Sequence, residues 1–235
     1  MPKYALLTAV LMMLASILGA DYIVGFEGAG ETKLAYASGY VTLSGISWNL
    51  TDVLIGTDPP DWKNGLRSAR LRGYGTSAMT MQADRSGGIG TLTFQYRRYG
   101  TDAQVDWKVE YSVNGGSTWI QTGPSFTAST SDTPQSFSST LNLNGNIRIR
   151  IKRATESGTS NARLNIDDIT LTDYAAIPAT LTLAPTILTG FTYIQEVGPS
   201  DPQTYSITGQ NLSPASGNIS IAGAAAFEFS STGSS

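Results

Sequence analysis

The sequence predicts an all-β protein whose main unit is a β-sandwich. Short stretches in which apolar and polar residues alternate are separated by turns rich in Gly, Asn and Asp, and no stretch has a convincing helical period. Many strands without helices are typical of a sandwich or barrel. The length of 235 residues leaves room for one full sandwich and part of a second domain.

The clearest strand signal lies between Val105 and Val113, where apolar residues alternate with polar ones. This period of two predicts one buried and one wet face, with Trp107 in the core. The turn residues Asn114–Ser117 follow, so the chain is expected to return as a hairpin through Thr118–Gln121. The same reasoning predicts strands near Val41–Leu43, Trp48–Ile55, Ala69–Arg72, Met79–Gln82, Leu92–Arg97, Gln135–Leu141, Ile147–Lys152 and Leu164–Leu171.

The first twenty residues have the pattern of a secretory signal peptide. Lys3 precedes an apolar run that ends in the small residues Gly19 and Ala20. The alternative is a membrane anchor, but the run is short for a spanning helix, which needs about 20 apolar residues. We therefore expect cleavage near Ala20, a secreted or cell-surface protein, and no membrane span after cleavage.

A second β pattern begins after residues 175–179, which read as a linker. The expected order is a signal peptide at 1–20, a sandwich at 21–174, the linker, and a further β-domain at 180–235. The last segment is too short for the roughly seven strands of an immunoglobulin-like sandwich. The chain is accordingly expected to be a fragment of something longer.

Six segments of the predicted sandwich carry a resemblance to a known family: Phe26–Tyr36, Trp48–Gly56, Lys63–Arg72, Tyr99–Asp102, Tyr111–Trp119 and Asn165–Leu171. They resemble a recurring module of secreted bacterial multidomain proteins, of the choice-of-anchor type, which is similar to carbohydrate-binding and MAM-like jelly rolls. The resemblance implies a jelly-roll β-sandwich that acts as a non-catalytic accessory module for binding, adhesion or spacing.

From Ala179 onward, with Thr208–Leu212, the chain resembles a truncated immunoglobulin-like repeat of the same proteins. Such modules often precede a nuclease, a protease or an anchoring region. The alternative function is therefore the N-terminal accessory region of a secreted hydrolase, such as a nuclease, with its catalytic domain beyond Ser235.

In jelly rolls of this kind, an acidic residue after the first strand approaches an acidic pair on the last strand, and they share a structural calcium. Here the resemblance points to Glu27 and to Asp167 and Asp168. Calcium accepts several carboxylate and backbone oxygens in loose geometry. Adjacent strand residues face opposite sides, so Glu27 and Asp168 are the predicted ligands. The open alternative is that the acidic pair caps a strand end and pairs with Arg163 or Lys152.

Arg148, Arg150 and Lys152 alternate with isoleucines and are predicted to share one strand face. With Tyr99 stacking nearby, this face could bind phosphates or an acidic polysaccharide. The preferred alternative is a solvated outer face that acidic residues on neighbouring strands balance.

The four tryptophans divide into two expected kinds. Trp107 and Trp119 alternate with aliphatic residues and are predicted to be core, whereas Trp48 and Trp62 are freer. Trp62 follows Asp58–Asp61 in a loop, which is a better place for recognition. The candidate ligand-binding residues are therefore Trp62, Tyr99, Arg148 and Arg150.

Composition limits the chemistry. The chain has no His and no Cys, which excludes a Ser-His-Asp triad, a Cys-His pair and the usual zinc sites. Nothing places a catalytic carboxylate pair, so no enzymatic activity is expected. A net charge of -3 and a pI near 4.9 mean that the chain as a whole does not attract nucleic acid electrostatically. An extracellular polysaccharide or a cell-surface component is the expected partner.

Overall fold

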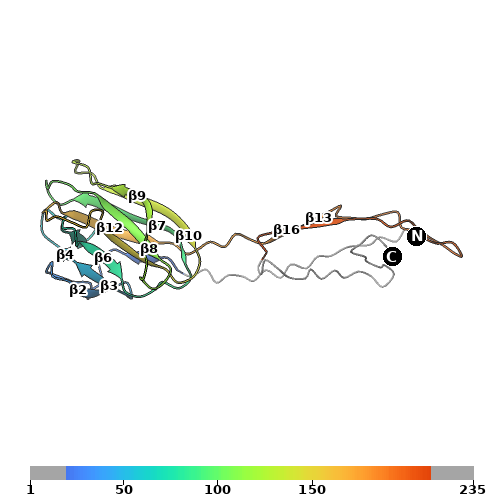
Figure 1. Ribbon diagram of the computed structural model, residues 1–235, viewed down its shortest axis with the longest axis horizontal. Coiled ribbons are helices and arrows are strands. Elements are labelled where there is room, and N and C mark those ends of the chain that lie inside the picture. The colour runs from blue at the N-terminus through green and yellow to red at the C-terminus, as the bar shows by residue number, and fades with distance from the viewer. Residues whose placement is uncertain (1–19, 213–235) are drawn as a thin grey trace. The chain divides into compact units, whose positions relative to one another are not determined.

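The structure is a computed structural model that describes residues 20–212 (Figure 1). This part of the chain consists of strands, turns and irregular segments and contains no helix, so the predicted all-β class is confirmed. Its strands are β1 Tyr22–Val24, β2 Gly39–Leu43, β3 Ile46–Thr51, β4 Val53–Gly56, β5 Ser68–Leu71, β6 Ala78–Met81, β7 Ile89–Arg98, β8 Trp107–Ser112, β9 Ile120–Phe126, β10 Gln135–Leu143, β11 Arg148–Arg153, β12 Leu164–Leu171, β13 Thr180–Ala184, β14 Tyr193–Ile194, β15 Gly198–Pro199 and β16 Ser206–Gln210.

Two antiparallel six-stranded sheets form the sandwich. Sheet 1 has the order β10-β7-β12-β5-β4, with β1 paired to β12, and sheet 2 has the order β2-β3-β6-β11-β8-β9. Along the strands, alternate apolar side chains turn inward and fill the space between the sheets. This arrangement is the predicted jelly-roll sandwich (Figure 1). Residues 20–212 contain no helix that is long and apolar enough to cross a membrane.

Aromatic side chains close the edge of the sandwich where β9 and β10 meet. The rings of Phe94 and Phe137 stack with centroids 4.8 Å apart, and those of Tyr96 and Phe126 lie 4.7 Å apart. All four side chains are buried. The rings of Phe126 on β9 and Phe137 on β10 lie 5.3 Å apart and join the two edge strands directly. Such pairs stabilise beyond the area that they bury.

The first strand is tied to the opposite sheet by a buried polar contact. The Tyr22 hydroxyl donates to the carbonyl of Leu43 over 2.6 Å and accepts from Nε1 of Trp48 over 2.9 Å. Trp48 is fully buried, so the expectation that it is one of the freer tryptophans was wrong. It alternates with Leu50 along β3, and both face the core.

The single strand predicted over Trp48–Ile55 is in fact two strands in different sheets. β3 belongs to sheet 2 and β4 belongs to sheet 1. Between them, Asp52 has a φ of 50°, a left-handed conformation that Asp adopts more readily than most residues. Its carboxylate lies 3.6 Å from the guanidinium of Arg72, which helps to hold the corner.

The predicted hairpin is confirmed. β8 and β9 pair antiparallel on either side of the Asn114–Ser117 turn. Trp107 is fully buried, as predicted. Trp119 is not core, contrary to expectation: it is half-buried, and the guanidinium carbon of Arg150 lies 4.4 Å from its ring centroid. It lies just before β9, outside the alternating pattern of that strand.

A second compact unit begins at Ala176. Within it β13 pairs with β16, and β14 pairs with β15, both antiparallel. Residues 213–235, which complete the predicted immunoglobulin-like segment, lie outside the described residues, as does the predicted signal peptide up to residue 19. Both assignments therefore stay predictions.

Candidate functional site

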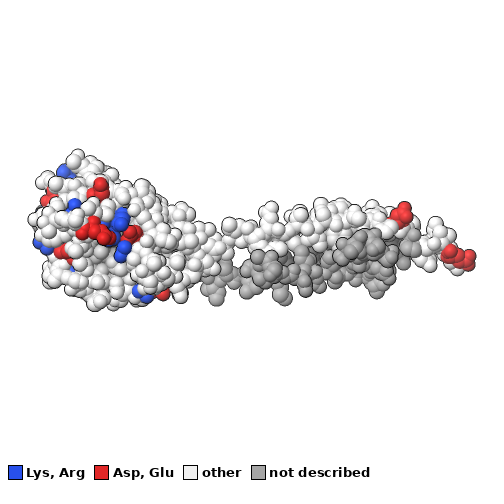
Figure 2. Space-filling model, in the orientation of Figure 1, with Lys and Arg blue, Asp and Glu red and all other residues white. Residues whose placement is uncertain are grey.

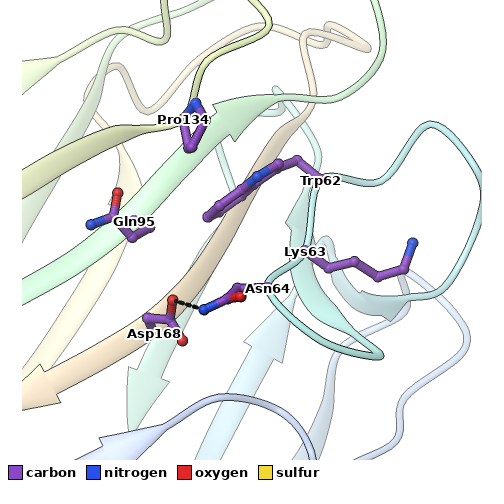
Figure 3. A pocket seen from close by; sticks show the side chains of 6 residues that line it. All are labelled: Trp62, Lys63, Asn64, Gln95, Pro134 and Asp168. Atoms are coloured by element: carbon purple, nitrogen blue, oxygen red, sulfur yellow. Dashed lines mark hydrogen bonds between the residues drawn. The ribbon is translucent and has the colours of Figure 1, made fainter.

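An open hollow of about 370 Å³ lies at the outer surface of sheet 1. β7 and β12 form its floor, the loop between β4 and β5 supplies an indole and two polar side chains, and a proline comes from the segment before β10. Figure 3 shows the Trp62 ring extending over the sheet between Pro134 and Asn64. The lining residues are Trp62, Lys63, Asn64, Gln95, Pro134 and Asp168.

The Trp62 loop is held in place by a buried polar network. Trp62 donates its backbone N–H to Oδ1 of Asn165 over 3.2 Å, and its carbonyl accepts from the Ser68 hydroxyl over 2.7 Å. The Asn165 amide donates in turn to Oδ1 of Asp61 over 2.8 Å. Asn165 has no exposed surface, and Asp61 is 5% exposed. These satisfied buried groups fix the backbone that carries the indole.

Gly56 is required beside this network. A Cβ atom at this position would lie 2.3 Å from Oδ2 of Asp61. The Asp61 carboxylate also accepts from the backbone of Asp58 over 2.9 Å, and its Oδ1 lies 3.5 Å from the guanidinium of Arg70. The absence of a side chain at residue 56 is what lets this carboxylate approach β4.

The acidic residues singled out in the sequence gather at the same loop. Asn64 donates its backbone N–H to Oδ2 of Asp167 and its side-chain amide to Oδ2 of Asp168, both over 2.8 Å. Glu27 accepts from the backbone N–H of Leu66 over 2.8 Å through Oε1. The structure therefore brings both predicted calcium ligands to the Trp62 loop.

Asp167 and Asp168 have different environments. Asp167 has no exposed surface, whereas Asp168 is partly exposed and lines the hollow. The register of β12 against β7 shifts here, and Asp168 has a φ of 52°. Burial raises the pKa of Asp167 to about 7, and the negative charges of Asp168 and Glu27 add to that rise.

The alternative pairing considered for these carboxylates is wrong. Arg163 is bound to Asp102, with Nε to Oδ2 at 2.6 Å, and Lys152 is bound to Glu156 over 2.6 Å. Across residues 20–212, however, no three or more carboxylate, His or Cys side chains are grouped so as to hold a metal ion. Calcium at Glu27 and Asp168 therefore stays a prediction.

Arg148 and Arg150 lie on the other sheet, on its outer face. Arg148 contacts Asp84 over 2.5 Å, and Arg150 contacts Glu110 over 2.5 Å. Lys108 shares the Glu110 carboxylate over 2.8 Å. Figure 2 shows acidic and basic atoms side by side on the visible face of the sandwich. The cations of this face are thus paired with carboxylates, as the preferred interpretation of the sequence has it.

Tyr99 lies beside the Trp62 loop but does not line the hollow: the next residue, Gly100, donates its backbone N–H to the carbonyl of Pro60 over 3.1 Å. Tyr99 follows the end of β7, and the guanidinium carbons of Arg163 and Arg70 lie 3.9 Å and 4.7 Å from its ring centroid. Because two cations already lie over the ring, the side chain serves the packing at this end of the sandwich. The ring of Tyr99 is thus paired with Arg70 and Arg163, and not with Arg148 or Arg150 as the sequence predicted.

Comparison with known proteins gives matches among solved structures alone. A scan against models of known protein families finds no match, and a search of curated proteins finds none. Solved structures are similar at low identity. The CBM22-1 xylan-binding domain of Paenibacillus barcinonensis Xyn10C has 11% identity and a TM-score of 0.47, with 69% of this chain and 100% of that chain covered.

Two further solved structures also match at low sequence identity. The K1 cleaved adhesin domain of Lys-gingipain from Porphyromonas gingivalis W83 has 12% identity and a TM-score of 0.47, covering 67% of this chain and 100% of that one. A CBM35 from Paenibacillus barcinonensis has 18% identity and a TM-score of 0.38, covering 66% and 98%. At these identities the likeness concerns the fold, and the ligand has to be argued from this chain's own residues.

Proposed function

We propose that the sandwich is a non-catalytic extracellular module that binds glycan in the Trp62 hollow. The observation that carries the proposal is the position of one partly exposed indole among amide and carboxylate groups, over a rigid sheet. An aromatic face packs against the apolar face of a sugar ring, and a few placed polar groups bind its hydroxyls. Trp62 supplies the aromatic face, and the polar groups come from Asn64, Gln95 and Asp168.

The charges around the hollow favour a neutral or amino sugar over a polyanion. Asp168 lines the hollow itself, and Asp167 and Glu27 lie behind the same loop. Lys63 is the lining cation, and its side chain extends away from the indole (Figure 3). Its ammonium lies 3.4 Å from the carbonyl of Asp58. A phosphate backbone would meet uncompensated negative charge here, so nucleic acid is a poor ligand.

Structural calcium at Glu27 and Asp168 is a second part of the proposal. Its support is the excess of negative charge: three carboxylates share one loop, and the charges of two of them contribute to the raised pKa of Asp167. Calcium suits carboxylate oxygens of this kind. With calcium, the melting temperature of wild type should exceed that in chelator, and Asp168→Asn should abolish the difference. Equal melting temperatures for wild type in calcium and chelator would contradict this part.

The test of glycan binding compares two half-exposed tryptophans. Wild type, Trp62→Ala and Trp119→Ala would be incubated with insoluble polysaccharides and with a soluble glycan panel, and retention would be measured. We expect Trp62→Ala to lose retention by at least about tenfold, because it removes the aromatic face on which the sugar ring would pack, and a loss of about 1.4 kcal/mol is tenfold in affinity. Trp119→Ala should retain the ligand.

Thermal melts of the three proteins show whether each variant is folded. Retention of the ligand by a folded Trp62→Ala would contradict the site. Retention by no protein, across neutral, amino and acidic glycans, would contradict the function and leave a structural spacer.

A further inference from the structure

The first strand of the sandwich starts beside the predicted cleavage point, so the fold places the new N-terminus. In the antiparallel pairing of β1 with β12, Tyr22 lies opposite Leu171. Continuing this register by one and two residues puts Asp21 beside Thr172 and Ala20 beside Asp173. Opposed residues of an antiparallel pair lie about 4.5–5.5 Å apart at Cα. The peptide bond between Ala20 and Asp21 thus lies close to Asp173.

An unfilled acceptor lies next to this bond. Arg85 is 7% exposed and donates to Oδ1 of Asp173, to the carbonyl of Gly88, and to the carbonyl of Ala20 over 3.3 Å. Oδ2 of Asp173 is buried and has no hydrogen-bond partner among residues 20–212. A buried carboxylate oxygen without a donor is destabilising, because it has lost water and gained no replacement.

Backbone hydrogen bonds hold the chain on both sides of the ion pair between Arg85 and Asp173. Thr172, the residue before Asp173, donates to the carbonyl of Thr91 and accepts from Gly90, each over 2.9 Å. Arg85 exchanges backbone hydrogen bonds with Ile147 over 2.9 and 3.1 Å. The carboxylate and the guanidinium therefore occupy fixed positions beside the start of β1.

We propose that the mature N-terminus binds Asp173. Hydrolysis of the Ala20–Asp21 bond adds water, so Ala20 leaves with a carboxylate and Asp21 keeps an amine, which takes up a proton at neutral pH. The α-ammonium of Asp21 has three donors, where the uncleaved peptide nitrogen has one. It donates to Oδ2 of Asp173, while Arg85 retains Oδ1 and loses the carbonyl of Ala20.

Processing thereby completes the fold. The precursor cannot form this ion pair, because its Asp21 nitrogen belongs to a peptide bond. Once the terminus is released, it fastens β1 to the end of β12 at the point where the chain enters the sandwich. The inference concerns maturation and is independent of the glycan-binding proposal.

The experiment compares mature chains that differ in their first residue. One chain begins at Asp21, made with a protease that leaves no extra residue, and the other carries Gly-Ser before Asp21. Each is prepared with native Asp173 and with Asp173→Asn, and Asp201→Asn, an exposed carboxylate of the second unit, is the matched control. Melting temperatures are measured at pH 7, and the terminus of the naturally secreted protein is read by mass spectrometry.

We expect the Gly-Ser extension to lower the melting temperature by about 3–6 °C in the native and Asp201→Asn backgrounds, and by much less in Asp173→Asn. Chemical acetylation of the mature α-amine should reproduce the loss, which covers the case in which Asp173→Asn does not fold. An extension without effect, an equal effect in all backgrounds, or a secreted protein that does not begin at Asp21 would overturn the proposal.

Discussion

The side-chain amide of Asn165 donates to Oδ1 of Asp61 over 2.8 Å, although 104 residues separate the two in sequence. The same asparagine accepts from the backbone of Trp62. β12 therefore fixes the loop that carries the candidate binding residue.

Replacing Asn165 should damage both stability and binding. Asn165→Leu keeps the approximate shape but leaves the Asp61 carboxylate with one partner fewer in the interior. We expect a loss of about 2–4 kcal/mol in the free energy of unfolding, since a buried acceptor is left unsatisfied. Urea denaturation would measure it, with the exposed Asn161→Leu as the control. A loss no larger than that of the control would show that the network does not hold the loop.

A methyl group at residue 56 tests the same loop from the other side. Gly56→Ala would push a Cβ into the Asp61 carboxylate, so the loop must move. Gly30→Ala is the control, because no heavy atom lies within 4 Å of a Cβ built there. We expect Gly56→Ala to cost about 1–3 kcal/mol and to weaken glycan retention, and Gly30→Ala to be near neutral. Equal unfolding midpoints for the two variants would contradict this account.

The fold was largely predictable from the sequence because its signals are local. Alternation over Val105–Val113 and the Asn-Gly-Gly turn after it specify a hairpin without reference to the rest of the chain. The corner at Asp52 was missed because apolar residues continue through Val53–Ile55, and nothing local marks the change of sheet. The burial of Trp48 did have a signal, since Trp48 and Leu50 alternate with Ser47 and Asn49.

The candidate site was only partly predictable. Trp62 could be found because it lies in a polar loop, and Asp168 because of the resemblance. Gln95 and Asn165 could not be found, because their roles depend on which strands pair, and Asn165 lies far from the loop in sequence. Tyr99 was misplaced for the same reason: its neighbours Arg70 and Arg163 come from distant segments.

The contact of Tyr22 with Trp48 should contribute to the cohesion of the two sheets. Tyr22→Phe removes the hydroxyl that accepts from the Trp48 indole and donates to Leu43, which leaves the buried Nε1 of Trp48 without its partner. We expect a loss of about 1–3 kcal/mol in the free energy of unfolding. Tyr40→Phe is a matched control, because Tyr40 is 72% exposed. If both variants unfold at the same urea concentration, the bridge is not important to stability.

Asp167 should give the protein a pH dependence between about pH 4 and 7 in the presence of chelator. Burial raises its pKa in the folded state from 3.8 to about 7, so between these values the folded state holds a proton that the unfolded state has lost. The contribution of Asp167 to the free energy of unfolding is therefore fully present below pH 4. It is lost as the pH rises through 7, where the folded state also gives up the proton. Asp167→Asn should remove this part of the slope, although it also lowers stability, because one of the two backbone donors from Asn64 and Asp168 loses its acceptor.

The measurement is a series of urea denaturation curves from pH 4 to 8 on wild type, Asp167→Asn and the exposed Asp201→Asn. Wild type and Asp201→Asn should lose stability in parallel as the pH rises, and Asp167→Asn should lose less. Added calcium should flatten the wild-type curve if the predicted ion binds beside this carboxylate, because a cation favours its charged form. Parallel curves for all three proteins in chelator would mean that Asp167 is ionised in the folded state at ordinary pH, and that the loop around Asn64 already compensates its charge.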